Sequence, residues 1–309
     1  MRIRNLIAAV TLLLTFASIS DAADLLYVSL NNEIITYDTS SNVGSTISAS
    51  RAVFANTQLN EAFGMAFDVS GNLYVANRSG NSISKFNKSG SYVSNITSNL
   101  NEPTGIAFDS SGNLYVANQS GNSISKFNSS GGFVSSITSN LNYPLGIVFD
   151  SSGNLYAANH FVSTISKFDA SGAYISSIST HLDGPWGMAF DSSGNLYTTN
   201  NGLSANINEI SKHNSSGTYI GSITSNLTSP LGIVFDSTGN LYASNYRANT
   251  ITKFDPSGNF LTSWSTGTGV YGASPYMAFK PVSVPEPSTY ILATIAASTL
   301  AYVAHSRKK

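Results

Sequence analysis

A short pattern, G-[IM]-[AV]-F-D, recurs along most of this chain of 309 residues. Its glycine falls at Gly64, Gly105, Gly146, Gly187 and Gly232, so that three intervals are 41 residues and the fourth is 45. A fixed period of this length indicates supersecondary units that repeat in space and that bury their apolar faces against one another. The period therefore constrains the fold more than any other feature, and it leaves the function open.

Each repeat unit predicts four short β-strands. In the unit from Pro103 to Tyr143, apolar runs at 106–108, 114–117, 124–127 and 133–137 are separated by turns rich in Asp, Asn, Ser and Gly. Turn residues at intervals of about ten residues indicate all-β structure, and four antiparallel strands in about 40 residues form one blade of a β-propeller. The first two runs are apolar on both faces and predict inner strands. The last two alternate and predict strands nearer the rim.

The ends of the repeat region complete the count of blades. Five full units begin near Ala62, Pro103, Pro144, Pro185 and Pro230. Residues 26–28 and 35–38 match the second and third strands, and residues 275–279 match the first strand, with Met277 in place of the repeat glycine. Because a closed ring removes exposed sheet edges, we expect an all-β, six-bladed propeller of four-stranded antiparallel blades over residues 23–283, closed between N- and C-terminal strands.

The motif P-x-G-I-A-F-D-S-S-G-N-L-Y-V-A-N resembles the NHL repeat, whose members form six-bladed propellers. The resemblance extends over about residues 25–279. Many NHL repeats carry Asp after the Y-V-A run, whereas this chain carries Asn77, Asn118, Asn159, Asn200 and Asn245. The departure removes a ring of acidic charge, so the resemblance implies no function that depends on that charge.

Composition limits the classes of partner. Charged residues make up 10% of the chain, well below the usual share of about 25%, and a polar, weakly charged surface is typical of exported proteins. Cysteine is absent, which excludes disulfides and thiolate metal sites. Residues 23–284 carry 10 basic and 14 acidic side chains and no basic stripe, which argues against nucleic-acid binding.

Residues 1–22 predict a secretory signal peptide. Arg2 and Arg4 precede an apolar run from Leu6 to Ala17, and Ser20 and Ala22 supply small residues at a cleavage site. The alternative, an N-terminal membrane anchor, is disfavoured because a run of 12 residues is too short for about 30 Å of hydrocarbon.

Residues 284–309 predict a sorting and anchor segment. Pro285, Glu286 and Pro287 precede an apolar run of 15 residues, Tyr290 to Ala304, and a basic end. The positive-inside rule keeps that end cytoplasmic. This order resembles the PEP-CTERM signal of Gram-negative bacteria, which implies recognition of the Pro-Glu-Pro triplet by exosortase. The chain would then be anchored transiently in the inner membrane by this helix and sorted to the cell envelope or exterior. A plain C-terminal anchor is the alternative.

Two regular positions carry charge in each unit: an Asp in the first turn and a Lys in the third strand. The aspartates are Asp68, Asp109, Asp150, Asp191 and Asp236, and the lysines are Lys85, Lys126, Lys167, Lys212 and Lys253. D-S-S-G-N resembles oxygen-rich calcium loops, but each turn has one carboxylate, and Asp in such a turn bonds its own backbone. We therefore predict turn capping, with an Asp–Lys pair in each blade, and we assign no metal and no cofactor.

Candidate binding residues lie where the repeat is irregular. The turns between the second and third strands and the connections between blades share one face of a propeller, where irregular loops can carry binding. The candidates are Arg78, Tyr143, His160, Phe161, Asp183, Trp186, Tyr246 and Arg247. Aromatic and charged side chains on a Ser/Asn background suit sugar or peptide contacts, and neutral loop drift is the alternative. His213 replaces a third-strand Phe and is expected at the rim, either packed or facing solvent.

The sequence thus favours a non-catalytic, exported binding scaffold for a polysaccharide or an envelope protein. We assign no catalytic residue. Resemblance to propeller lyases and lactonases, virginiamycin B lyase among them, implies an enzyme as the alternative, and such an enzyme requires a cluster of His, Asp and Glu facing the central channel. A structural surface protein is the third possibility.

Overall fold

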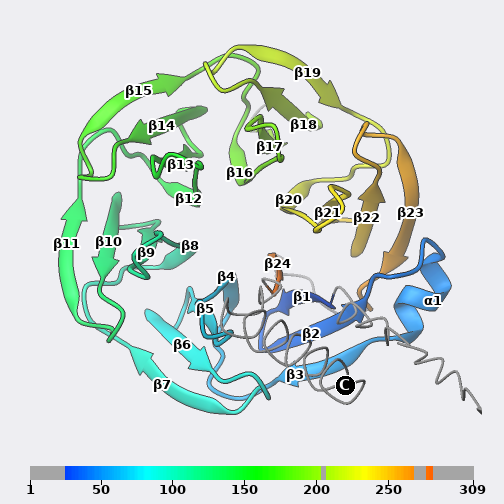
Figure 1. Ribbon diagram of the computed structural model, residues 1–309, viewed down its shortest axis with the longest axis horizontal. Coiled ribbons are helices and arrows are strands. Elements are labelled where there is room, and N and C mark those ends of the chain that lie inside the picture. The colour runs from blue at the N-terminus through cyan, green and yellow to red at the C-terminus, as the bar shows by residue number, and fades with distance from the viewer. Residues whose placement is uncertain (1–24, 203–206, 268–275, 281–309) are drawn as a thin grey trace, which may run out of the picture.

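The computed structural model describes residues 25–202, 207–267 and 276–280, which form a six-bladed β-propeller (Figure 1). Each blade is a four-stranded antiparallel sheet, as the repeat predicts. The predicted signal peptide, the segment 284–309 and the boundaries of the propeller lie outside the described residues. No helix within the described ranges is long and apolar enough to cross a membrane.

We number the blades in chain order, starting from the blade that contains the N-terminal strands. From blade 1 to blade 6, the inner strands are β24 (Met277–Phe279), β4 (Ala62–Phe67), β8 (Pro103–Phe108), β12 (Pro144–Phe149), β16 (Pro185–Phe190) and β20 (Pro230–Phe235). The second strands are β1 (Leu25–Leu30), β5 (Leu73–Asn77), β9 (Leu114–Asn118), β13 (Leu155–Asn159), β17 (Leu196–Asn201) and β21 (Leu241–Asn245). The third strands are β2 (Glu33–Asp38), β6 (Ser82–Phe86), β10 (Ser123–Phe127), β14 (Thr164–Phe168), β18 (Asn208–His213) and β22 (Thr250–Phe254). The outer strands are β3 (Ala52–Ala55), β7 (Tyr92–Ile96), β11 (Phe133–Ile137), β15 (Tyr174–Ile178), β19 (Tyr219–Ile223) and β23 (Phe260–Ser265).

Blade 1 closes the ring with strands from both ends of the chain, as predicted. β24 pairs with β1 in the register Leu26↔Phe279, Tyr27↔Ala278 and Val28↔Met277. That register corrects one assignment. Met277 pairs as Met65 does in blade 2, so the residue in the place of the repeat glycine is Tyr276. The correct alignment follows the sequence M-A-F, which both strands share.

The apolar core lies between the blades. A typical seam joins Tyr74, Ala76 and Ile83 of blade 2 to Ile106 and Val116 of blade 3. The second strands β5, β9, β13 and β21 are buried along their whole length, whereas the outer strand β7 is mostly exposed. The prediction of inner and rim strands is therefore confirmed. Each blade contributes to two seams, so the blades stabilise one another.

One short helix was not predicted. α1 (Gly44–Ala49) lies in the connection between β2 and β3 and packs at the seam of blades 6 and 1, beside β23 (Figure 1). Ile47 is its only buried residue, and it joins the core cluster that contains Trp264. A single large apolar residue in six gives no helical periodicity from which a helix could be predicted.

The recurring aspartates cap their own turns. Asp109 accepts hydrogen bonds from Asn113 N at 2.8 Å and from Asn113 Nδ2 at 2.8 Å, and Lys126 Nζ lies 3.6 Å from Asp109 Oδ2. Burial opposes ionisation, but the hydrogen bonds from Asn113 and Ser111 and the charge of Lys126 hold the pKa of Asp109 below its usual value. The same Asp–Lys pair occurs in blades 2, 4 and 5. The capping prediction is confirmed, and the predicted Asp–Lys ion pair is confirmed in blades 2 to 5. In blade 6, Asp236 caps its turn in the same way, and Lys253 Nζ donates a hydrogen bond to Thr39 O at 3.2 Å.

The asparagines at the end of the second strands hold the connections between blades in place. Asn118 Oδ1 accepts a hydrogen bond from Asn101 N at 3.1 Å, and its Nδ2 lies 2.9 Å from Ser125 Oγ. Asn77, Asn159, Asn200 and Asn245 make equivalent bonds, and all five are buried. An amide both donates and accepts here, which a carboxylate does not do. This ring is structural.

His213 occupies the place that Phe86, Phe127, Phe168 and Phe254 hold in other blades. It is fully buried, its Nε2 lies 2.9 Å from Thr180 O, and its ring packs edge-on against Tyr219. The expectation of rim packing is confirmed and the solvent-facing alternative is wrong. Burial lowers the pKa of His213, because a cation loses its hydration there.

This histidine predicts acid sensitivity. An unfolded histidine titrates near pH 6.5, so the unfolded chain binds more protons than the folded chain below that pH, and the folded state loses stability there. We expect the free energy of unfolding to fall between pH 6.5 and 5, by at most about 1.4 kcal/mol per pH unit for each such histidine, and His213→Phe to reduce that slope. Urea titrations at several pH values measure the free energy of unfolding at each pH. An equal change of this free energy with pH in the native chain and in His213→Phe would contradict the prediction.

Candidate functional site

The irregular residues gather at one end of the central channel, which we call the mouth. In each of blades 2 to 6, the residue that precedes the inner strand accepts a backbone hydrogen bond from the residue that follows the second strand or, in blade 5, from the residue that ends it. The pairs are Glu61 and Arg78, Glu102 and Gln119, Tyr143 and His160, Gly184 and Asn201, and Ser229 and Tyr246. The first member of each pair has a φ between 49° and 57°. This geometry places two variable positions per blade at the mouth, and in blade 5 one of them is Gly184, which has no side chain.

Four of the predicted residues form a connected aromatic cluster. The rings of Tyr143 and Phe161 are stacked with centroids 4.1 Å apart. His160 lies 5.4 Å from Phe161 and 5.3 Å from Trp186, the latter in an edge-on arrangement. His160 is buried, whereas Phe161 is 54% exposed. Such a cluster offers apolar faces to a ligand and carries polar atoms at its edges.

Aromatic side chains meet across the mouth. Phe63 of blade 2 and Trp186 of blade 5 stack with centroids 6.0 Å apart, although two blades lie between them on either side of the ring. Tyr276 of blade 1 lies 4.7 Å from Phe63. Sequence reasoning missed Phe63, because an apolar residue in an inner strand is indistinguishable from core. It also missed Tyr276, because the glycine position was assigned to Met277.

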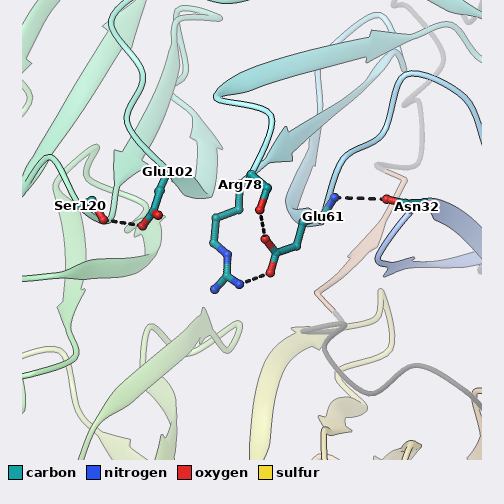
Figure 2. A network of polar contacts seen from close by, with 6 residues as sticks. Asn32, Glu61, Arg78, Glu102 and Ser120 are labelled. Carbon is teal, nitrogen blue, oxygen red and sulfur yellow. Dashed lines mark hydrogen bonds and ion pairs between the residues drawn. The ribbon is translucent and has the colours of Figure 1, made fainter.

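A polar network surrounds Arg78 (Figure 2). Arg78 forms an ion pair with Glu61, which also accepts a hydrogen bond from Ser79 Oγ. The guanidinium carbon lies 5.2 Å from the centre of the Phe63 ring, within the range of a cation–π contact. On the neighbouring blade, Glu102 accepts a hydrogen bond from Ser120 (Figure 2). Arg78 thus contributes to the mouth as a neutralised pair.

Four of the eight buried polar side-chain atoms without a hydrogen-bond partner in the described structure lie at the mouth. Within the described ranges, Gln119 Oε1, His160 Nδ1, Trp186 Nε1 and Tyr276 OH have no hydrogen-bond partner. Such groups are costly to bury unless water or a ligand satisfies them. Burial lowers the pKa of His160, while Gly184, Pro185 and the charge of Asp183 act in the opposite direction. The imidazole is therefore neutral at pH 7 and can accept or donate a hydrogen bond.

The remaining candidates are less closely connected. The backbone N of Asp183 donates a hydrogen bond to Asn200 Oδ1 at 3.1 Å. The charge of Asp183 raises the pKa of His160, against the larger effect of burial. Tyr246 shares the mouth position of His160 through its bond to Ser229 O, and Arg247 is exposed beside it. No ring contact ties Tyr246 to the aromatic cluster in the described structure.

The channel below the mouth holds an apolar cavity of about 520 Å³. The cavity is lined by the inner strands, from the glycine position to the phenylalanine that ends each strand, and the lining contains Met65, Ile106, Ile147, Val148 and Ala189 among others. Its described lining residues include no His, Asp or Glu, and the described part of the chain has no group of three such residues that could hold a metal ion. Among the described lining residues, the only ionisable side chain is that of Tyr276.

Comparisons with known proteins concern the repeat and the fold. The model of the NHL repeat matches residues 100–127. The structure is similar to a chain of a nidogen/laminin complex (TM-score 0.71, 19% identity, covering 84% of this chain and 98% of that chain). It is also similar to a catalytically inactive virginiamycin B lyase from Staphylococcus aureus with quinupristin (0.60, 14%, 84% and 93%) and to a streptogramin B lyase (0.62, 16%, 83% and 87%). No curated protein matches the sequence. The chain thus carries an NHL repeat and folds as a six-bladed β-propeller.

Proposed function

We propose that this protein is an exported, non-catalytic binding module that holds a polysaccharide or an envelope protein at the mouth of its channel. The observation that carries the proposal is the mouth cluster, in which Tyr143, His160, Phe161 and Trp186 are in ring contact and buried polar atoms have no partner. A rigid ring of blades holds these side chains in place, so little conformational entropy is lost on binding.

Export and sorting are part of the same proposal. The N-terminal segment 1–22 directs export, and the C-terminal segment resembles a PEP-CTERM signal that exosortase recognises at Pro285, Glu286 and Pro287. The protein then reaches the envelope or exterior of a Gram-negative bacterium after transient anchoring in the inner membrane. A lyase or lactonase activity is disfavoured by the apolar lumen.

Affinity capture from envelope extracts tests the binding. The bait ends after residue 283 and so retains every described strand. We expect it to retain a polysaccharide or an envelope protein, and the double variant Trp186→Ala/Phe161→Ala to retain at least roughly tenfold less, since central aromatic residues dominate binding energy. Equal capture by both baits would show that the mouth is not the site. Mass measurement of the native exported protein tests the sorting, because an intact tail would favour a plain anchor.

A further inference from the structure

We propose that the mouth face of blade 4 binds a neutral, linear oligosaccharide along a track that runs outward from the channel. The proposal rests on the proposed function and narrows it to one ligand class and one blade. The blade 4 track comprises the aromatic cluster Trp186, His160, Tyr143 and Phe161 and an adjoining groove whose lining includes Asn142, Val162, Thr164, Tyr174 and Ser177.

The inner half of the track presents aromatic faces to solvent. Phe161 and Val162 are 54% and 50% exposed, and Phe161 is supported from behind by its stack on Tyr143. In blade 3 the same two turn positions hold Ser120 and Gly121. A pyranose ring carries C–H groups on its faces and hydroxyls at its edge, so it can stack on a supported aromatic ring while its edge stays hydrated.

The outer half of the track is a groove of about 250 Å³ whose lining is mainly polar. Tyr174, 43% exposed, lies at its outer side with its hydroxyl 3.0 Å from Ser177 Oγ. The side chain of Asn159 already bonds Asn142 N and Ser166 Oγ within the protein. Sugar hydroxyls would therefore bond the side chains of Asn142, Tyr174 and Ser177. Hydroxyls and amides that both donate and accept suit a ligand that also does both.

The corresponding place on blade 5 is filled by the protein itself. His181 stacks on Tyr219, the counterpart of Tyr174, with centroids 3.5 Å apart and planes inclined by 4°. In blade 4 the residue at the position of His181 is Asn140, which leaves the face of Tyr174 to the groove. The stack in blade 5 shows that this tyrosine position accepts a flat ring.

The charges at the mouth favour a neutral ligand. Arg78 is paired with Glu61, and Glu102 and Asp183 add negative charge beside the track. Within the track, His160 is neutral and has an unpartnered, buried Nδ1. An acidic sugar or a phosphate would find no unpaired cation at the track to offset the loss of its hydration, whereas a neutral sugar has no charge to desolvate.

Calorimetry with defined saccharides tests the proposal. The purified full chain is titrated with hexasaccharides of β-1,4-glucan, β-1,3-glucan and β-1,4-mannan, and with oligogalacturonate as the acidic member. We expect at least one neutral hexasaccharide to bind and oligogalacturonate not to bind. Phe161→Ser, which installs the blade 3 residue, and Tyr174→Ala should each weaken binding about tenfold, equivalent to about 1.4 kcal/mol.

Phe133→Ala is the matched control, because Phe133 holds the position of Tyr174 in blade 3 and is equally exposed at 43%. It should leave binding unchanged, and thermal midpoints should show that all three variants fold. The proposal is overturned if no neutral saccharide binds, if oligogalacturonate binds best, or if Phe161→Ser and Tyr174→Ala bind as the native chain does. Should capture by the mouth succeed while these titrations fail, or should the captured partner be a protein, the proposed function stands and the blade 4 track does not.

Discussion

Replacing Gly105 with alanine should destabilise the whole propeller, although the change adds one methyl group. A Cβ at Gly105 would lie 2.9 Å from Ile147 N and 3.0 Å from Gly146 Cα, and closer still to Leu145 O. These atoms are backbone of the neighbouring inner strand, which cannot move aside without opening the seam between blades 3 and 4. Overpacking a tight interior costs about 1–3 kcal/mol, and a clash with backbone places this change at or above the upper end.

The matched control is Gly132→Ala. Gly132 lies in a turn before an outer strand, where a Cβ would meet only the side chain of Asn128, and blade 4 already has Ala173 at that position. We expect its urea midpoint to stay close to that of the native chain. The midpoint of Gly105→Ala should fall well below both, while the dependence of its unfolding free energy on urea concentration stays unchanged. If the two variants unfolded at the same urea concentration, the inner strands would not be packed as tightly as the geometry requires.

Much of the fold could be predicted because every complete blade packs against its neighbour through the same residue types at the same positions. Gly64, Gly105, Gly146 and Gly187 each face the backbone of the next inner strand, so the glycine recurs and reveals the period. In blade 1 the glycine position was assigned to the wrong residue, one place too late, because Tyr276 occupies that position and resembles no repeat residue. α1 escaped notice because one buried residue, Ile47, holds it.

The candidate site could be predicted only where it differs from the repeat in chemistry. Tyr143, His160, Phe161 and Trp186 interrupt a Ser/Asn background, and the topology of a propeller brings them to one face. Phe63 is as apolar as its neighbours, and its place opposite Trp186 depends on the ring diameter, which no local pattern encodes. Likewise, the groove beside Tyr174 depends on one residue. Blade 4 has Asn140 at the position where blade 5 has His181, which covers the corresponding tyrosine.

Ending the chain after residue 267 should abolish cooperative folding of the propeller. The truncation removes β24, which pairs with β1 and contributes Met277 to the core cluster that contains Leu26, Val28 and Tyr242. Ser29 Oγ of β1 also accepts a hydrogen bond from Tyr276 N at 3.0 Å and donates one to Phe63 O of blade 2 at 2.9 Å, so the truncation removes one partner of the side chain that links blade 1 to blade 2. Each large side chain removed from the core costs roughly 1.5–3 kcal/mol, and β1 is left as an unpaired inner edge.

A chain that ends after residue 283 is the control, because it loses the C-terminal segment and keeps β24. Calorimetric scans should show one sharp transition for this control. For the chain ending at residue 267 we expect a broad, low-temperature transition with exposed apolar surface, or aggregation through the open edge. A sharp transition at the control's temperature would mean that five blades and an incomplete sixth suffice. Ring closure, which gives every blade two neighbours, would then contribute little to the stability of this propeller.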